Sequence, residues 1–475
     1  MMREYGSIIG GEEIFTGKWI DVKNPYTGKV VGRVNSLPPA EIEKVVQVTH
    51  DTTITLSRYE RHQILNKMAD AIDERVEEIS LMITDESGLC LSDTMYEASR
   101  VADVLRFSAI RTYDDDSQVF PCDISKNGRK RRIYTTRIPL KLIACITPFN
   151  HPMNQVVHKI APAIATNNTV ILKPAQRTPL SSYYLAKLAL DCGLPPHMLN
   201  VINGPTKETY DILVKSEMVS MVSFTGSTKI GKDIANNCGY KKIVIELGGS
   251  SALIVCPDAD VDEAVDITMA GLFKNSAQRC TAIRRLVVHD SIADEYAAKL
   301  TEKASKLNYG DPYNPNNDMG TVISEEAATM MEQRVNATIA AGAKLLLGNI
   351  RQGAVYSPTV LDHVKNEHAV VCEETFGPVA PIIRYSTLDE AIEIANDSAY
   401  GLSGGVVSNH WPTIQRVINE LETGTINVNE APSYRLEWTP FGGIKDSGLG
   451  YKEGVIETMK AYTNVKTYSL PWDTP

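Results

Sequence analysis

One cysteine of the chain stands in a polar context that suits a nucleophile. Cys280 directly follows Arg279, within the polar segment 275–281. A neighbouring cation lowers the pKa of a thiol and so raises the fraction of reactive thiolate. An isolated cysteine is more often a buried packing residue, so this segment alone leaves both interpretations open. The rest of the chain must decide whether Cys280 belongs to a catalytic site.

Two polar residues upstream have types that would complement a nucleophile. Glu246 follows the apolar run 243–245 and precedes two glycines. A carboxylate at the end of a buried strand is costly unless it is used or paired, which predicts a general base that activates water or a structural ion pair. Asn150 offers a side-chain amide that suits an oxyanion hole. It equally suits the cap of a helix that begins near Pro152.

A glycine turn further along the chain suits the binding of an anion. The run Phe224-Thr225-Gly226-Ser227, with Gly231 four residues later, indicates a strand, a turn and the start of a helix. Such a turn directs backbone N–H groups toward an anion such as a pyrophosphate. Lys173, at the end of another predicted strand, can reach a ribose or a phosphate, and the alternative is a solvated lysine.

Predicted strands and helices alternate between residues 140 and 246. The expected strands cover 142–146, 169–173, 199–203, 219–224 and 242–246, and the expected helices cover 152–165, 179–192, 206–216 and 228–237. Alternation with short connections predicts a parallel sheet with helices on both faces. Ligands of such sheets bind at the carboxyl ends of the strands, where Asn150, Lys173 and Glu246 fall.

A second alternating set follows and contains Cys280. Its expected elements are strands 252–256 and 284–289, helices 260–275 and 291–307, and strand segments around 354–361, 379–384 and 403–407. We therefore expect two α/β domains: a cofactor-binding domain of residues 1–114 and 138–248, and a catalytic domain of residues 249–455. The cleft between two such domains is the natural place for a cofactor and a substrate.

The remaining segments have a different character. Residues 7–35 indicate short strands and turns, and residues 40–113 show helical periodicity. Residues 115–137 predict a protruding hairpin that turns at Asn127-Gly128. The tail, 456–475, contains a strand-like run with no apparent partner left in its own chain. Together these last two segments predict a small β element for oligomerisation.

Composition excludes several classes of function. The chain has 475 residues, 43% of them hydrophobic, and a net charge of -10, so it is expected to be globular, with two or three domains, and not to bind nucleic acid. It has no apolar run long enough for a spanning helix and no signal-peptide core. The eight cysteines form no CxxC pair, which predicts reduced thiols in the cytoplasm and no metal site.

The motifs together resemble the aldehyde dehydrogenase superfamily over nearly the whole chain. They are Thr147-Pro148-Phe149-Asn150, Lys173-Pro174, Phe224-Thr225-Gly226-Ser227, Glu246-Leu247-Gly248-Gly249, Gln278-Arg279-Cys280, Glu373-Glu374-Thr375-Phe376-Gly377-Pro378 and Pro440-Phe441-Gly442-Gly443-Ile444-Lys445-Asp446-Ser447-Gly448. The resemblance implies a Rossmann-like cofactor domain, a second α/β catalytic domain and a small β oligomerisation element, in a homodimer or homotetramer. One stretch, Ser87-Gly88-Leu89-Cys90, departs from the Gly-Lys-Pro that many relatives have, and the sequence offers no reason for it.

The resemblance also implies roles for individual residues. Cys280 would be the nucleophile, Glu246 the base for hydrolysis of a thioester, and Asn150 a donor to the oxyanion. The residues implied to contact NAD or NADP are Thr147, Phe149, Lys173, Gln176, Gly226, Ser227, Gly231, Leu247, Glu374 and Phe376. Gln176 stands where NAD-selective relatives often have a glutamate. The absence of that negative charge predicts that NADP is accepted alongside NAD.

Basic residues near the predicted nucleophile indicate a small anionic aldehyde. The expected substrate-binding residues are Arg106, His158, Arg279, Thr281 and, more weakly, Arg435. Arginine forks match phosphate and phosphonate oxygens, and the set is similar to the phosphonoacetaldehyde dehydrogenase branch of the superfamily. Glyceraldehyde-3-phosphate, lactaldehyde and succinate semialdehyde remain alternative substrates. A non-catalytic binding protein of the same fold is the alternative of another class. Arg106 could instead face solvent, and His158 could be a core residue.

Overall fold

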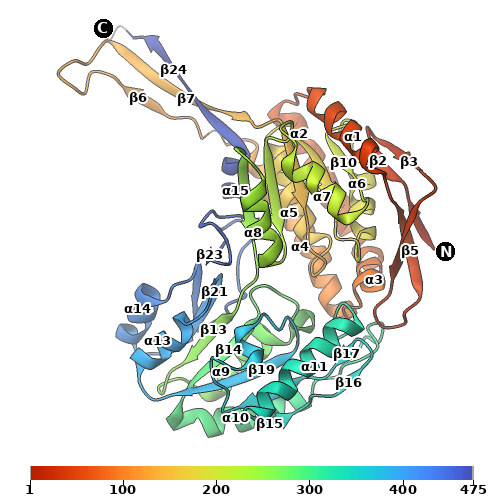
Figure 1. The fold of residues 1–475 in the computed structure, drawn as a ribbon. Helices are drawn as coiled ribbons and strands as arrows, with labels where there is room; N and C mark the ends of the chain where they lie inside the picture. Colours follow the sequence, from red (N-terminus) through yellow and green to blue (C-terminus); the bar gives the residue numbers. More distant parts are fainter. Residues whose placement is uncertain (1, 115, 473–475) are drawn as a thin grey trace.

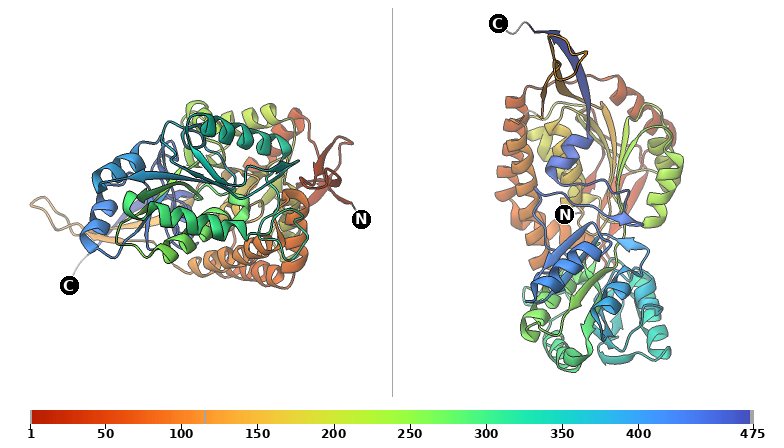
Figure 2. Two further views of the ribbon diagram at one scale, coloured as in Figure 1. Left: turned by 90° about the horizontal axis from the view of Figure 1, so that it is seen from below. Right: turned by 90° about the vertical axis from the view of Figure 1, so that its left-hand side faces the viewer.

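The computed structural model describes residues 2–114 and 116–472. Its body consists of two lobes, each built on a seven-stranded sheet, and a narrow arm projects from the first lobe (Figure 1). Figure 2 shows the two lobes one above the other, with the arm at the end farthest from the second lobe. This arrangement confirms the predicted α/β fold with a cofactor-type domain and a second α/β domain. Asp115 and residues 473–475, which belong to the predicted oligomerisation element, lie outside the described residues.

The first sheet contains the alternating elements that the sequence predicts. Its strands, in spatial order, are β12 (Lys242–Glu246), β11 (Met221–Thr225), β8 (Leu142–Ile146), β9 (Thr169–Lys173), β10 (Leu199–Val201), β2 (Ser7–Ile9) and β3 (Glu12–Ile14). The strands from β12 to β10 run parallel, and β2 and β3 continue the sheet antiparallel. The carboxyl ends of β8, β9, β11 and β12 therefore share one edge of the sheet, as expected.

Helices cover both faces of this sheet because its strands are apolar on both faces. The helices are α1 (Pro39–Asp51), α2 (Arg58–Asp73), α3 (Val76–Ser87), α4 (Leu91–Arg111), α5 (Asn154–Ala165), α6 (Leu180–Asp191), α7 (Thr206–Lys215) and α8 (Thr228–Asn237). Ile143 and Cys145 belong to the hydrophobic cluster formed with α2, α4, α5 and α6. Leu142 and Ala144, which point the other way, belong to the cluster formed with α1, α7 and α8. Complete burial of the β8 and β9 side chains is typical of a parallel sheet.

The second sheet carries the segment that contains Cys280. Its strands, in spatial order, are β15 (Lys344–Leu347), β18 (Thr359–Asp362), β19 (Val379–Tyr385), β14 (Ile283–His289), β13 (Ser251–Val255), β21 (Ser403–Val407) and β22 (Thr425–Val428). The helices around it are α9 (Val261–Leu272), α10 (Asp290–Ser305), α11 (Glu325–Ala340), α13 (Leu388–Asn396) and α14 (Trp411–Glu420). The predicted helix 260–275 ends earlier, at Leu272. The backbone of Asn275, Ser276 and Ala277 has positive φ angles that an α-helix cannot contain.

Short elements complete the chain. They are β1 (Arg3–Tyr5), β4 (Trp19–Lys23), β5 (Val30–Asn35), η1 (Lys274–Ala277), β16 (Arg351–Gln352), β17 (Val355–Tyr356), α12 (Ala369–Cys372), β20 (Tyr400–Gly401), β23 (Ile444–Lys445) and α15 (Val455–Ala461). α15 returns to the first lobe and packs against α4 and α5. Within residues 2–114 and 116–472, no helix is both long and apolar enough to cross a membrane.

The arm corrects one prediction about the tail of the chain. Its three strands are β6 (Val119–Pro121), β7 (Arg131–Pro139) and β24 (Thr463–Pro471). β24 pairs antiparallel with β7 along its whole length, so the expectation that it has no partner in its own chain is wrong. β6 covers only the first part of the other edge of β7. Exposed apolar side chains such as Phe120 and Tyr468 remain on the arm. Its use in joining subunits stays a prediction.

Candidate active site

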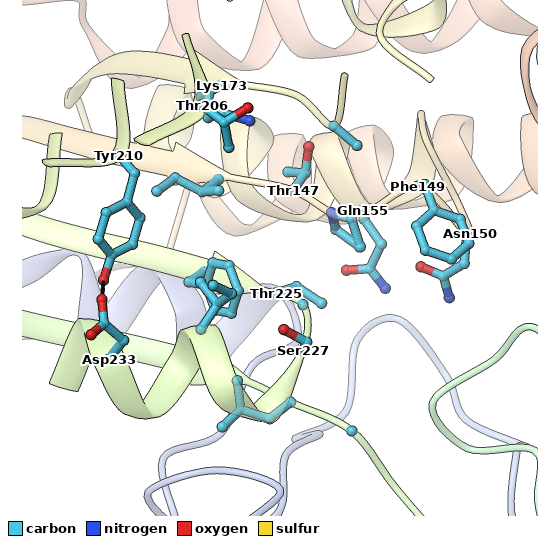
Figure 3. A pocket seen from close by; sticks show the side chains of 18 of the residues that line it. Thr147, Phe149, Asn150, Gln155, Lys173, Thr206, Tyr210, Thr225, Ser227 and Asp233 are labelled. Atoms are coloured by element: carbon cyan, nitrogen blue, oxygen red, sulfur yellow. Dashed lines mark hydrogen bonds between the residues drawn. The ribbon is translucent and has the colours of Figure 1, made fainter. Parts of the chain in front are cut away.

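A cavity of about 830 Å³ opens at the carboxyl edge of the first sheet and reaches Cys280 of the second lobe. Among the residues that line it are Thr147, Phe149, Asn150, Lys173, Gly226, Ser227, Leu247, Cys280, Glu374 and Phe376. Figure 3 shows that Phe149 and Asn150 lie at one end of this cavity and Tyr210 and Asp233 at the other. The tertiary structure thus brings together eight of the ten residues predicted to contact the cofactor.

The other two predicted cofactor residues, Gln176 and Gly231, are not among the lining residues, although Gln176 follows the lining residue Ala175. Gln176 donates from Nε2 to the carbonyl oxygen of Gly204 over 2.8 Å, and its Oε1 accepts from the hydroxyl of Thr206 over 3.1 Å. Gly231 matters because it has no side chain: a Cβ atom there would lie 2.1 Å from Cδ2 of Leu247. Leu247 itself lines the cavity, so the glycine makes room for that side chain.

Two oppositely charged groups, Lys173 and Glu374, line the cavity. Burial lowers the pKa of Lys173 to about 8, and its Nζ donates to the carbonyl oxygen of Pro174 over 3.3 Å. Burial raises the pKa of Glu374, although the backbone N–H of Gly249 donates to its Oε1 over 3.1 Å. An ammonium and a carboxylate held in a buried groove are suitable partners for the hydroxyl groups of a ribose.

The far end of the cavity has a lining that sequence reasoning missed. It includes Thr206, Lys207, Tyr210, Asp211, Lys215, Ile230, Asp233 and Asn237. These residues belong to α7 and α8, where Tyr210 donates a hydrogen bond to Asp233, as Figure 3 shows. The sequence predicts both helices but contains no signal for which of their faces a ligand would meet. A cavity of this length, with a glycine turn beside it, fits an elongated dinucleotide.

A second, smaller cavity lies on the other side of Cys280. Its volume is about 130 Å³, and it shares Asn150, Gln155 and Cys280 with the large one. Its other lining residues are Asp93, Tyr96, Glu97, Arg100, His151, Lys274, Asn275, Arg279, Thr281, Ser433, Tyr434, Arg435 and Phe441. The thiol therefore stands between a large cavity and a small one, where a reaction between two bound molecules could take place.

Cys280 and Glu246 are in direct contact. The Cys280 thiol donates to Oε1 of Glu246 over 2.9 Å. Burial and the Glu246 carboxylate raise the pKa of the thiol, whereas the positive charge of Arg435 lowers it. Burial and the nearby Glu453 carboxylate raise the pKa of Glu246 itself. The pair is thus arranged so that one proton can pass from the sulfur to the carboxylate.

Asn150 is not a helix cap in this structure. α5 begins at Asn154, and its N-cap is Met153. The Asn150 side chain instead donates from Nδ2 to the carbonyl oxygen of Gln278 over 2.8 Å. A primary amide carries two N–H groups, so this contact uses one of them and leaves a second donor in the amide. Because Asn150 lines both cavities, that donor is placed near the thiol.

Arg279 lines the small cavity but is anchored away from the thiol. It donates to the carbonyl oxygens of Ala270 and Gly271, over 2.9 and 2.8 Å, in the last turn of α9. A cation at that end of a helix is favoured by the helix dipole. The Arg279 Nε atom is buried and has no hydrogen-bond partner within residues 2–114 and 116–472. Although Arg279 precedes Cys280 in sequence, Arg435 is the cation with the larger effect in lowering the pKa of the thiol.

The expectation that Arg106 lines the substrate pocket is wrong. Its guanidinium pairs with Asp70 and Asp73 of α2, at 2.8 and 2.7 Å, on the surface of the first lobe. Arg100 lies on the same helix and faces the small cavity. Its Nε donates to Oε1 of Glu437 over 2.5 Å. Six residues correspond to about 1.7 helical turns, so the two arginines point in different directions.

The expectation for His158 is also wrong. Its ring is buried behind the small cavity, and its Nε2 lies 2.6 Å from Oε2 of Glu437. It is therefore the core residue that the alternative interpretation described. His151 lines the cavity instead, and its Nδ1 lies 2.6 Å from the carbonyl oxygen of Asn150. Its place next to Asn150 in the sequence was the available signal. Thr281 and Arg435 both line the cavity, as expected.

Comparison with known proteins identifies the group to which these features belong. A sequence model of the aldehyde dehydrogenase family matches residues 14–468. A 3-sulfolactaldehyde dehydrogenase of Priestia aryabhattai is 36% identical over 462 residues, which cover 96% of this chain and 97% of that protein. The structure of aldehyde dehydrogenase 21 from Physcomitrella patens, in complex with the reaction product succinate, matches with a TM-score of 0.96, 31% identity and 99% coverage of both chains. An NADP-dependent glyceraldehyde-3-phosphate dehydrogenase of Bacillus halodurans, complexed with NADP, matches with a TM-score of 0.94, 32% identity and complete coverage of both chains.

Proposed function

Because the chain belongs to the aldehyde dehydrogenase family, we propose that it oxidises a small phosphonate- or phosphate-bearing aldehyde to the carboxylic acid. Because it belongs to this family, the protein is an NAD(P)-dependent enzyme. The observation that carries the choice of substrate is the small cavity beside Cys280, which three arginine side chains line: Arg100, Arg279 and Arg435.

The contacts of Cys280 support its role as the nucleophile. Its thiol proton passes to Glu246, whose Oε1 accepts from the sulfur over 2.9 Å, and the thiolate adds to the aldehyde carbon. The oxyanion that forms is stabilised by the Asn150 amide and by the backbone N–H of Cys280, and one such donor contributes about 3 kcal/mol. Phe149, Glu374 and Phe376 line the large cavity that would hold a nicotinamide cofactor, which would supply the hydride acceptor, so that the adduct on Cys280 becomes a thioester.

Glu246 then acts a second time. It first releases to solvent the proton that it accepted from the thiol; its ionised carboxylate then takes a proton from a water molecule, and the hydroxide attacks the thioester carbon. The carboxylic acid leaves and Cys280 is restored as a thiolate. The raised pKa of Glu246 suits a general base, because a base is most effective when its pKa lies near the working pH. Thr225, whose hydroxyl donates to Oε2 over 3.4 Å, helps to orient the carboxylate.

The size and charge of the small cavity support a short anionic substrate. A volume of about 130 Å³ favours a short substrate over a long-chain one. Guanidinium groups bind phosphate and phosphonate oxygens through paired hydrogen bonds. The three relatives described above are named for a sulfonated aldehyde, a phosphorylated aldehyde or a dicarboxylate product, all of them anionic. Phosphonoacetaldehyde is the substrate we favour, and glyceraldehyde-3-phosphate, 3-sulfolactaldehyde, lactaldehyde and succinate semialdehyde are the alternatives.

An aldehyde panel with arginine variants tests this proposal. For Arg100→Ala and Arg279→Ala we expect kcat/KM for phosphonoacetaldehyde to fall by about 10- to 100-fold, because each lost charge-assisted hydrogen bond is worth about 1.5–3 kcal/mol. The value for propanal should change by less than about threefold, since a neutral aldehyde has no anionic group to bind. The measurement is steady-state formation of NAD(P)H with each aldehyde.

Arg106→Ala is the matched control for these variants. It removes an arginine from the same helix as Arg100, but one that pairs with Asp70 and Asp73 outside the cavity. It should leave both substrates nearly unaffected. Equal losses for phosphonoacetaldehyde and propanal in Arg100→Ala would refute an anion-binding role. A preference for sulfonated or carboxylated aldehydes over phosphonoacetaldehyde would move the proposal to those substrates.

The choice of cofactor depends on the surroundings of Lys173. Gln176 is neutral and stands where NAD-selective relatives often have a glutamate; its side chain is held by a hydrogen bond to the carbonyl oxygen of Gly204. We therefore expect the protein to use NAD and NADP with kcat/KM values within about tenfold of each other. Gln176→Glu should lower kcat/KM for NADP by at least about tenfold and affect NAD little, because a carboxylate would repel the 2′-phosphate. Initial rates at varied cofactor concentration provide the measurement. Equal effects on both cofactors would show that Gln176 does not face the 2′ position of the ribose.

A further inference from the structure

The backbone just before Cys280 is strained. Asn275, Ser276 and Ala277 have φ angles of 60°, 49° and 57°, and all three residues are buried. Residues other than glycine seldom adopt this left-handed conformation, and they do so as single residues rather than in runs. Strain of this kind persists only where surrounding contacts hold it, and it concentrates at functional sites.

Two hydrogen bonds connect this strained turn to the rest of the site. The backbone N–H of Asn275 donates to Oδ2 of Asp93 over 2.8 Å. The Asn275 side chain donates from Nδ2 to the carbonyl oxygen of Asn150 over 3.1 Å. Asn150 in turn donates from its own Nδ2 to the carbonyl oxygen of Gln278, two residues before Cys280. The turn therefore links Asp93 with both the oxyanion donor and the nucleophile.

Asp93 is itself held by an unusual part of the sequence. The Cys90 thiol donates to the same Oδ2 atom over 3.2 Å, and Cys90 is completely buried. Burial and the Asp93 carboxylate raise the pKa of the Cys90 thiol to about 12, so the thiol keeps its proton and remains a donor. Gly88, at φ 72°, ends α3, and Cys90 is the N-cap residue of α4. The stretch 87–90 thus places a thiol where it can orient Asp93.

We propose that Asp93 is a positioning residue that, fixed by Cys90, holds the left-handed turn 275–277 and thereby aligns Cys280 with Asn150. The proposal rests on the proposed role of Cys280 as the nucleophile. A carboxylate in the wall of a cavity meant for an anion weakens substrate binding, so its presence there calls for another reason. That reason is the hydrogen bond that Asp93 accepts from the backbone N–H of Asn275. A buried backbone N–H without an acceptor would destabilise the turn.

Variants of Asp93 should separate turnover from substrate binding. In Asp93→Ala we expect kcat for propanal and the alkylation rate of Cys280 by iodoacetamide to fall by about tenfold, since the turn loses its acceptor. The KM for phosphonoacetaldehyde should stay the same or decrease, because a negative charge leaves the cavity. Asp93→Asn retains an acceptor oxygen and should stay within about threefold of the original protein. Asp103→Ala, an exposed aspartate on the same helix, is the control.

Adding a second substitution, Ala277→Gly, tests whether the loss in Asp93→Ala arises from the turn 275–277. Glycine adopts the left-handed conformation without strain, so adding Ala277→Gly to Asp93→Ala should restore much of the lost alkylation rate and kcat. Cys90→Ala should produce a smaller loss of the same kind, about threefold. Cys256→Ala, which changes a buried cysteine in the second lobe, should produce none. If Asp93→Ala does not fold, which a thermal melt reveals, the double variant and Cys90→Ala still provide the comparison.

Two results would overturn the proposal. One is an unchanged kcat and alkylation rate in Asp93→Ala with a change in KM alone, which would assign Asp93 to electrostatics of the cavity. The other is a loss that Ala277→Gly does not reduce at all. Failure of the proposed function has a different signature, since the unmodified protein would then prefer another aldehyde to phosphonoacetaldehyde while the effect of Asp93→Ala on alkylation of Cys280 would remain. Alkylation of Cys280, followed by peptide mass spectrometry, needs no aldehyde and reports on the turn in either case.

Discussion

Replacing Cys280 by serine is expected to abolish the formation of NAD(P)H with every aldehyde, by at least about 10³-fold in kcat. A serine hydroxyl is far less acidic than a thiol. The group placed to accept its proton is the Glu246 carboxylate, which is too weak a base to ionise a hydroxyl. Steady-state assays and a rapid-mixing measurement of the first turnover provide the test. Retention of more than about a hundredth of the activity would mean that Cys280 does not form the covalent intermediate.

Two controls make this loss interpretable. The variant should still bind NAD(P), as followed by quenching of protein fluorescence, because Cys280 is only one of the many residues that line the large cavity. Cys122→Ser, in the arm, should keep full activity.

Replacing Glu246 by glutamine is expected to separate oxidation from hydrolysis. Loss of a general base reduces the rate by about 10²- to 10⁴-fold, so steady-state turnover should fall by that amount. The first turnover needs no water, and should still release up to one NAD(P)H per subunit when the thiol is ionised by raised pH. The acyl group then remains on Cys280, where intact-protein mass spectrometry can detect it. A variant that lacks both the burst and the acyl-enzyme would show that Glu246 is needed mainly before hydride transfer.

The same variant should change how the thiol responds to pH. The Glu246 carboxylate raises the pKa of Cys280, so its replacement by a neutral amide should lower that pKa. Alkylation of Cys280 should then become fast at a lower pH than in the original protein. In the original protein, hydrolysis should increase with pH through the pKa of Glu246, which burial raises above the usual value, because only the ionised form accepts a proton. An alkylation profile that shifts to higher pH in Glu246→Gln would contradict the observed contact.

The elements around the active site are largely predictable because their signals are local. Strands β8 and β9 are short apolar runs bounded by polar residues, and the prediction of their limits agrees with the structure. The strained turn 275–277 is different. Nothing in the residues Asn275-Ser276-Ala277 demands positive φ angles, and the helix was therefore predicted to continue to residue 275. Distant contacts from Asp93 and Asn150 impose that conformation.

The errors in the substrate pocket have the same origin. Arg100 and Arg106 are equally plausible from sequence, since both lie on α4 and neither is apolar. The acids of α2 attract Arg106, and Glu437, which lies far away in the sequence, attracts Arg100. His158 was likewise expected to bind substrate, but its Nε2 lies 2.6 Å from Oε2 of Glu437 and its ring is buried in the core. In each case the deciding partner comes from another part of the chain.

The reaction class is what the sequence by itself determined, because Cys280, Glu246 and Asn150 stand in motifs whose order and spacing are characteristic of one family. Alternation of strands and helices also determined that the cofactor residues share one edge of a sheet. Only the tertiary structure shows which arginines line the small cavity, how the thiol contacts Glu246 and what holds the turn before Cys280. Side-chain direction on a helix and the pairing of buried charges depend on neighbours that folding brings together from distant segments.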